Sequence, residues 1–142
     1  MTMADILRSK GSRIISVQPG DSVVAAAAVL SREGIGAVLV REGERVAGIL
    51  SERDIVRCVA KHGEAAMRIP VADMMTRGVV FCTPEDSIDE VMSLMTERRF
   101  RHLPVQDRGR LVGIVSIGDV VKHRIEKTER EAQALREYIA TG

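Results

Sequence analysis

A serine followed three residues later by an aspartate occurs twice in this 142-residue chain, as Ser51 with Asp54 and as Ser116 with Asp119. Each pair follows a glycine and two apolar residues and precedes a segment with helical apolar spacing, which predicts a strand-to-helix junction. The first N–H groups of a helix favour an anion. Such a hydroxyl and carboxylate could therefore hold phosphate oxygens and sugar hydroxyls. They could equally cap the helix and complement its positive end.

A cluster of basic side chains ahead of the second pair has no counterpart in the matching segment ahead of the first. The segment ERRFRH at 97–102 supplies Arg99, Arg101 and His102, whereas its counterpart EGIGA at 33–37 contains no cation. A guanidinium presents a fork of donors that suits phosphate, so these residues, joined by Arg53 beside the first pair, are candidate phosphate ligands. The alternative is a solvated helix end whose cations complement the dipole. If the cations bind phosphate, the two corners differ in affinity.

Both pairs belong to an internal repeat. Shifting the sequence by 65 residues aligns 14–57 with 79–122 without a gap, and the lead-in ADILRSKG recurs as ADMMTRG. Apolar, turn and polar positions stay in register together, which indicates two copies of one structural unit. Identical residues include Pro19 and Pro84, Asp21 and Asp86, Ser22 and Ser87, Val40 and Val105, Gly48 and Gly113, and Ile49 and Ile114.

Each copy predicts the same order of elements, β-α-β-β-α. A helix begins at Asp21 or Ser22 and ends at Gly34, with a counterpart that begins at Ser87. Two short strands follow in each copy, at 36–40 and 46–50 and again at 102–105 and 111–115, and a second helix begins at Ser51 or Ser116. Because neither copy can bury its apolar faces alone, we expect an α+β fold of two repeats packed as a pseudo-two-fold pair.

The repeat suggests four segments along the chain. A first domain covers 4–60, a linker 61–70, a second domain 71–125, and a charged C-terminal helix 126–142. The last segment keeps Ile125, Ala132, Leu135 and Ile139 roughly on one side, so we expect it to extend the preceding helix and to pack on the domain or on a partner chain.

Composition narrows the classes of function. A net charge of +1 and 2% aromatic residues disfavour a nucleic-acid platform. The sequence shows no signal peptide and no apolar run long enough to cross a membrane, so we expect a cytoplasmic protein. Cys58 and His62 lie one helical turn apart, but two ligands rarely hold a metal. No nucleophile and base stand at a catalytic spacing, so we do not expect an enzyme or a metal site.

The helix start Pro-x-Asp-Ser, the strand RHLPV and the endings GILSERDIV and GIVSIGDVV resemble the cystathionine-β-synthase (CBS) domain family, over about residues 4–125. The chain looks like a stand-alone CBS-domain pair. The resemblance implies a regulatory or energy-sensing module that binds an adenine nucleotide in the cleft between the repeats without catalysis. AMP is the leading candidate, and ATP, ADP, NAD(H) and S-adenosylmethionine are alternatives. It also implies a homodimer and an unknown regulated protein, with no membrane or nucleic-acid partner.

The same resemblance assigns roles to individual residues. Asp54 and Asp119 would bind ribose with Ser51 and Ser116 beside them, and Arg53, Arg99, Arg101 and His102 would bind phosphate. Adenine would lie between apolar side chains and backbone groups of Ile15, Val17, Ile35, Ala37, Val38, Val79, Val80, Thr83, Phe100, Leu103 and Pro104. A module that binds nucleic acid, or one that serves only as a structural interaction surface, is the alternative function.

Overall fold

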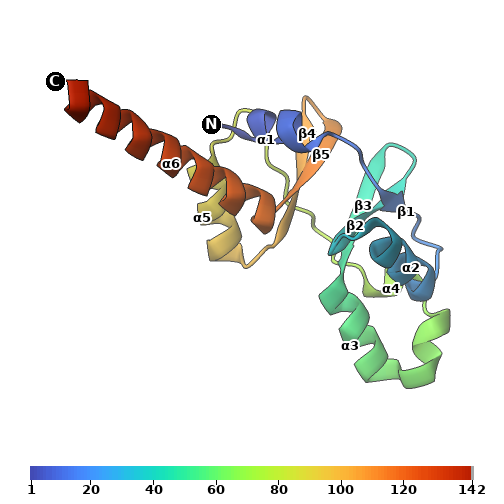
Figure 1. The fold of residues 1–142 in the computed structure, drawn as a ribbon. Coiled ribbons are helices and arrows are strands. Elements are labelled where there is room, and N and C mark those ends of the chain that lie inside the picture. Colours follow the sequence, from blue (N-terminus) through green and yellow to red (C-terminus); the bar gives the residue numbers. More distant parts are fainter. Residues whose placement is uncertain (142) are drawn as a thin grey trace. The chain divides into compact units, whose positions relative to one another are not determined.

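The computed structural model describes residues 1–141, and they fold as two compact units (Figure 1). One unit is Ile15–Val80, and the other combines Met1–Ile14 with Phe81–Gly142. The units differ from the expected segments in two respects. Residues 61–70, expected to be a linker, lie inside the unit 15–80, and the two lead-ins are exchanged. The lead-in ADILRSKG belongs to the unit of the second repeat, and the lead-in ADMMTRG belongs to the unit of the first.

The unit 15–80 is built on a three-stranded sheet. The strand β1 (Ser16–Val17) pairs in parallel with β2 (Ala37–Glu42), which pairs antiparallel with β3 (Arg45–Ser51). The helices are α2 (Val23–Glu33), α3 (Glu52–His62), the 3-10 helix η1 (Gly63–Arg68) and α4 (Val71–Met74). The buried apolar side chains of α2 and α4 meet the sheet in one core, made of Val17, Ala26, Leu30, Val38, Val40, Leu50, Val71 and Met75. A second, smaller cluster joins Val23 of α2, Cys58 of α3 and Ala66 of η1.

The other unit carries a two-stranded antiparallel sheet of β4 (His102–Asp107) and β5 (Arg110–Ser116). The helices α1 (Met3–Lys10), α5 (Ile88–Arg98) and α6 (Ile117–Thr141) belong to the same unit. The helix α1 packs on β5, where a side chain on Gly113 would collide with Leu7. In the unit 15–80 the short helix α4 reaches β3 in the same way, because Met75 lies against Gly48.

Serine caps confirm where the first helix of each repeat begins. The Ser22 side chain accepts a hydrogen bond from the Ala25 N–H at 3.0 Å, and Ser87 accepts one from the Glu90 N–H at 3.1 Å. Of the two candidates for the first cap, Ser22 is therefore the cap. Asp21 instead accepts a bond from the Gln18 N–H and closes the turn that leads into α2.

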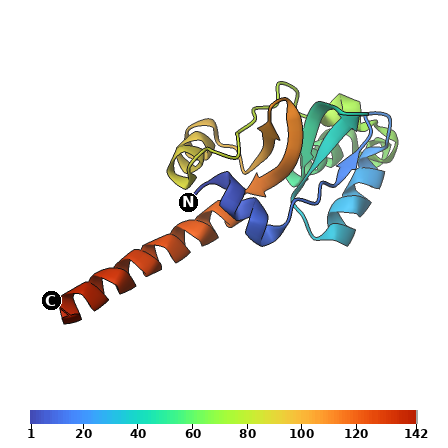
Figure 2. The same cartoon turned by 90° about the horizontal axis from the view of Figure 1, so that it is seen from above.

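The C-terminal segment is helical, as the sequence predicts. It continues α6 without a break, and in Figures 1 and 2 its outer half extends past α5 and α1. Only the beginning of α6 packs on its unit, through buried Val120 and His123. Leu135 and Ile139 are exposed, so within the chain the expected packing of this end is not formed.

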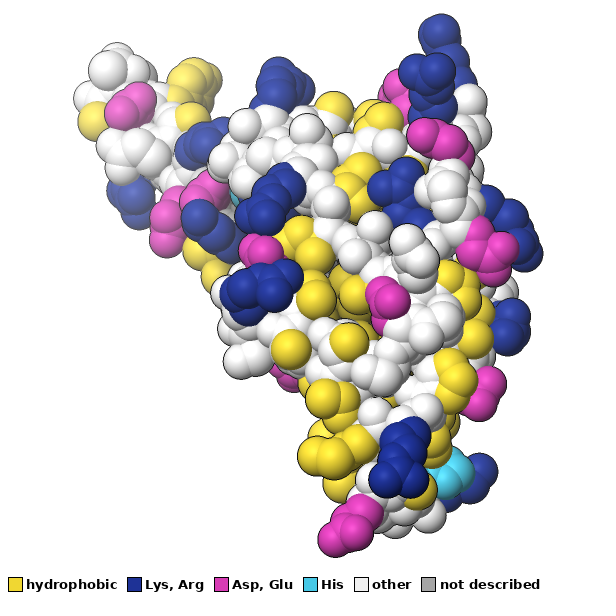
Figure 3. Space-filling view, turned by 90° about the vertical axis from the view of Figure 1, so that its right-hand side faces the viewer, with side chains coloured by type: hydrophobic (Ala, Val, Ile, Leu, Met, Phe, Trp, Pro, Cys, Tyr) yellow, Lys and Arg dark blue, Asp and Glu magenta, His cyan; other side chains and the backbone are white. Residues whose placement is uncertain are grey.

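Hydrophobic side chains also reach the surface of the unit 15–80. The lower end of Figure 3, which holds α3 and η1, shows several of them among charged residues. Val56 and Val59 of α3 and Met67 of η1 are each more than half exposed. The outward face of α3 therefore carries two exposed valines, which is unusual for a helix face in contact with water only.

Candidate functional site

The first Ser–Asp pair lies where β3 becomes α3. Ser51 is the N-cap of α3, and its N–H donates to Asp54 Oδ2 at 2.9 Å. The Ser51 hydroxyl donates to the same oxygen at 3.1 Å, and it accepts from the Asp54 N–H at 3.4 Å. Asp54 is 7% exposed, and Arg57 Nη1 lies 3.9 Å from its Oδ1. This reciprocal capping box fixes the carboxylate at the mouth of the helix.

The second pair repeats this geometry where β5 becomes α6. The Ser116 N–H donates to Asp119 Oδ2 at 2.8 Å, and the Asp119 N–H donates to Ser116 Oγ at 3.1 Å. Within residues 1–141 the other oxygen of this carboxylate, Oδ1, receives no hydrogen bond, so it remains available as an acceptor. Capping and ligand binding are therefore compatible at this corner.

A lysine from another element completes the second corner. Lys10, the last residue of α1, donates from Nζ to Asp119 Oδ2 at 2.7 Å and to the Ile114 carbonyl at 2.9 Å. Burial raises the pKa of the Asp119 carboxyl, but the bonds from Lys10 and from the Ser116 amide outweigh burial and leave that pKa below its ordinary value. Asp119 therefore stays ionised at neutral pH.

Sequence reasoning missed Lys10. Lys10 is 104 positions before Ile114 and 109 before Asp119 in the sequence. Nothing in the repeat indicates that α1 packs on the second repeat. The alignment of the two lead-ins gave little sign of this contact, because Lys10 in ADILRSKG aligns with another basic residue, Arg77, in ADMMTRG. In the structure the Arg77 guanidinium turns back to the Ala72 carbonyl of α4, at 3.1 Å.

Strand pairing brings two of the predicted cations to the second corner. His102, the first residue of β4, lies opposite Ser116 in the sheet, and the Arg101 carbonyl accepts from the Ile117 N–H at 2.8 Å. The first corner has the same backbone with small residues, since Ala37 lies opposite Ser51 and the Gly36 carbonyl accepts from the Glu52 N–H. The backbone of the basic residues Arg101 and His102 therefore lies beside the second Ser–Asp pair, and the backbone of Gly36 and Ala37 lies beside the first.

The other two predicted cations lie elsewhere. Arg99 ends α5 with a left-handed backbone, φ 58°, which an arginine adopts at a cost. Its counterpart Gly34 ends α2 with φ 65°. Arg53 is exposed in the first turn of α3, one residue before Asp54, and so belongs to the first corner.

The predicted adenine-binding residues fall into two groups by burial. Val38 and Leu103 are 1% and 0% exposed and are core residues of their strands, as are the buried Val17, Ala37 and Pro104. Ile15, Ile35, Val79, Val80 and Phe100 are half-buried, and Thr83 is exposed. Only this second group could contact a base without repacking of the core.

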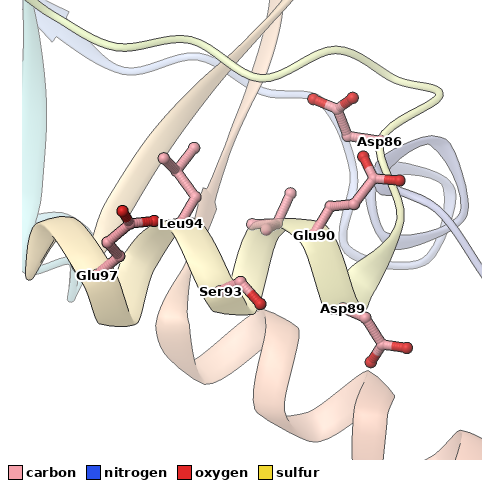
Figure 4. A pocket seen from close by; sticks show the side chains of 7 residues that line it. Asp86, Asp89, Glu90, Ser93, Leu94 and Glu97 are labelled. Atoms are coloured by element: carbon pink, nitrogen blue, oxygen red, sulfur yellow. The ribbon is translucent and has the colours of Figure 1, made fainter.

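A pocket of about 560 Å³ lies on α5, away from the Ser–Asp pairs (Figure 4). Asp86, Asp89, Glu90 and Glu97 contribute four carboxylates to its lining, and no predicted site residue lines it. A pocket of this charge repels phosphate, so we do not assign the nucleotide to it.

The structure gives little support to metal binding or to cysteine chemistry. Cys58 is fully buried, and residues 1–141 contain no group of three side chains that could hold a metal ion. Burial, helped by nearby Asp86, raises the pKa of the Cys82 thiol to about 12, so it is a poor nucleophile. Across the described chain no helix is both long and apolar enough to cross a membrane.

Comparison with known proteins identifies the class. The family model for the CBS domain matches residues 2–61 and again 71–126. The chain therefore belongs to the CBS domain family, and it is a CBS-domain pair, a regulatory type of module.

Three solved structures are similar to this chain. The CBS-domain protein ATU1752 of Agrobacterium tumefaciens is 44% identical with a TM-score of 0.85, over 87% of this chain and 99% of that one. CBSX2, solved in complex with AMP, is 25% identical with a TM-score of 0.74, over 89% and 98%. The CBS-domain pair of MJ0100, solved with 5′-methylthioadenosine and S-adenosylmethionine, is 25% identical with a TM-score of 0.79, over 89% and 98%. Adenosine compounds thus occupy two of these relatives.

Proposed function

We propose that this chain is a sensor that binds an adenine nucleotide at its Ser–Asp corners and passes the bound state to another protein. The observation that carries the proposal is the second corner, where the partly buried carboxylate of Asp119, the start of α6 and the backbone of Arg101 and His102 come together. Relatives that bind AMP or S-adenosylmethionine support an adenosine ligand.

Each part of the corner has a function toward such a ligand. Asp119 Oδ1 accepts hydrogen bonds from the ribose hydroxyls, because an ionised carboxylate is an acceptor only. The helix start and the side chains of Arg101 and His102 attract phosphate. This charge favours AMP, ADP, ATP or NAD(H) over S-adenosylmethionine, which carries a positive sulfonium. The first corner, where Arg57 contacts Asp54 and the segment before β2 has no basic residue, binds the same class of ligand more weakly.

The regulatory consequence follows from the element that bears Asp119. The Asp119 carboxylate accepts the Ser116 N–H at the start of α6. A ligand that forms hydrogen bonds with this carboxylate therefore changes the hydrogen bonding at the start of a 25-residue helix. The far end of α6 is exposed and can report that change to a partner. No catalytic step is part of this function, which is binding and signalling only.

Calorimetry of the full chain with AMP, ATP, NADH and S-adenosylmethionine tests the proposal. We expect AMP to bind, Asp119→Ala to weaken AMP at least tenfold, and Asp54→Ala to have a smaller effect. Asp5→Ala is the matched control, because Asp5 and Thr2 form the same kind of capping box at α1. Binding heat from none of the four compounds would overturn the sensor function. An Asp119→Ala variant with wild-type affinity would show that the ribose contact is wrongly assigned.

A further inference from the structure

The outer side of α6 carries an apolar stripe that no part of this chain covers among residues 1–141. Val121, Ile125, Leu135 and Ile139 are 37, 53, 59 and 68% exposed. With Thr128 and Ala132 between them, the stripe is spaced alternately by four and three residues, which is the a/d pattern of a coiled coil. A helix with this pattern presents a continuous seam to another helix.

This stripe is not the face by which α6 packs on its own unit. That inner face buries Val120 and His123, and Arg124 Nη1 contacts Asp89 of α5 at 3.0 Å. The stripe begins one residue further round the helix and continues into the outer half, where residues 133–141 are all exposed. A helical segment this short is marginal in water unless its apolar side is packed.

The charged residues beside the stripe indicate what packs on it. With Ile125, Ala132 and Ile139 at a positions, Arg124 and Glu131 take g positions, and Glu129 and Arg136 take e positions. In a parallel pair of identical helices a g residue faces the e residue of the next heptad in the other copy. Glu131 then faces Arg136, and Arg124, which also pairs with Asp89 of its own chain, faces Glu129, so both contacts join opposite charges.

The antiparallel arrangement of the same two helices is disfavoured by charge. With the stripes in full overlap it brings Glu131 against Glu131 of the second copy and Glu129 against Glu129. It also places Lys122 against Arg136. All three contacts join like charges, which cost stability at such positions.

We propose that α6 pairs in parallel with α6 of a second copy of this chain, through a two-stranded coiled coil over residues 121–139. This inference does not depend on nucleotide binding, because it uses only the outer surface of α6. It gives the module a defined two-fold partner at the end of the helix whose first turn holds Asp119.

Analytical ultracentrifugation of the full chain tests the seam. We expect reversible dimers, and Leu135→Glu should raise the dissociation constant at least tenfold. Ala134→Glu is the matched control, since it adds the same charge at an exposed neighbour outside the stripe, and it should leave the constant unchanged. A chain that stays monomeric, or a dimer that Leu135→Glu does not weaken, would overturn the proposal. Circular dichroism checks that each variant remains folded.

Charge reversal and cross-linking test the orientation. Glu131→Arg and Arg136→Glu should each weaken the dimer, and the double variant should restore it. Leu135→Cys should cross-link on oxidation, because a d residue meets its own copy in a parallel pair, whereas Glu137→Cys on the outer side should not. If Arg136→Glu strengthens the dimer and Leu135→Cys fails to cross-link, the helices are antiparallel and the proposed arrangement is wrong.

Discussion

The carboxylate of Asp54 is held by Ser51 and, at longer range, by Arg57, whereas that of Asp119 is held by Ser116 and by the ammonium of Lys10. The backbone around the two is the same, including the strand partner of each serine and the bond donated by the N–H of the first helical residue. Gene-level duplication of the fold therefore leaves two corners of different charge. On the proposed function, a phosphorylated ligand would meet Lys10, Arg101 and His102 at the second corner, and Arg53 and Arg57 at the first.

The source of this difference is the exchange of lead-in helices between the repeats. The helix α1 has eight residues and ends at Lys10, close to Asp119. The helix α4 has four residues, and its following basic residue, Arg77, bonds back to Ala72. The second corner is thus completed by a segment from the start of the chain, whereas the equivalent basic residue, Arg77, bonds within its own lead-in.

The largest difference in stability between the two units should follow substitution of the glycines that contact these lead-ins, Gly48 and Gly113. A Cβ on Gly48 would lie 2.7 Å from Met75 Sδ and 2.8 Å from the Thr76 carbonyl oxygen, and Thr76 is fixed by two backbone bonds to Ile49. A Cβ on Gly113 would meet only Leu7 methyl groups, at 2.6 Å and beyond, which can rotate away. We expect Gly48→Ala to lower the free energy of unfolding by about 3 kcal/mol and Gly113→Ala by about 1 kcal/mol.

Urea denaturation of both variants measures this difference. Gly20→Ala is a suitable control, because nothing lies within 4 Å of a Cβ there. Equal losses for the two variants would mean that the backbone of Thr76 yields as easily as the Leu7 side chain.

Much of this architecture follows from the sequence. The duplicated pattern predicts every strand of the two hairpins and the caps at Ser22, Ser51 and Ser87, because period and cap chemistry are local properties. The strand register that places His102 beside Ser116 follows from the same hairpins. Local signals suffice for these features.

The exchange of lead-ins and the role of Lys10 could not be predicted in this way. Both depend on contacts between residues more than 100 positions apart, which a single sequence does not encode in any local period. Burial has the same limit. Val38 and Leu103 fit an apolar adenine wall in the sequence, yet they are 1% and 0% exposed because both faces of their strands are covered.

The second contrast lies at the ends of α2 and α5. Gly34 and Arg99 share the left-handed conformation, with φ 65° and 58°, and nothing lies within 4 Å of a Cβ on Gly34. Backbone strain is then the main effect of exchanging them. We expect Arg99→Gly to raise the free energy of unfolding by about 1 kcal/mol and Gly34→Arg to lower it by a similar amount.

Thermal unfolding of both variants, with AMP titrations beside it, separates stability from function. If Arg99 binds phosphate, Arg99→Gly should gain stability and lose AMP affinity together. A gain in stability with unchanged AMP affinity would remove Arg99 from the predicted phosphate ligands.

The smallest contrast concerns the ion pair itself. The side chains of Lys10 and Asp119 are 33% and 24% exposed, so solvent screens their attraction, and we expect Lys10→Met to cost less than about 1 kcal/mol at neutral pH. The pKa of Asp119 is lowered on folding from an ordinary 3.8. Its stabilising contribution is therefore complete above that pH and is lost as pH falls through the still lower pKa of the folded state.

The free energy of unfolding measured from neutral to acidic pH tests this expectation. The wild type and Lys10→Met should differ in free energy of unfolding at pH 7 and converge as the pH falls below the lowered pKa of Asp119 in the folded state, where the carboxylate is protonated in both states. Arg8→Met serves as the control, because Arg8 pairs with exposed Asp5 on the same helix and does not touch Asp119. A difference that persists unchanged at pH 2 would mean that Lys10 acts through its packing on β5 and not through the charge of Asp119. In that case the proposed difference in affinity between the two corners would rest on Arg101 and His102 and not on Lys10.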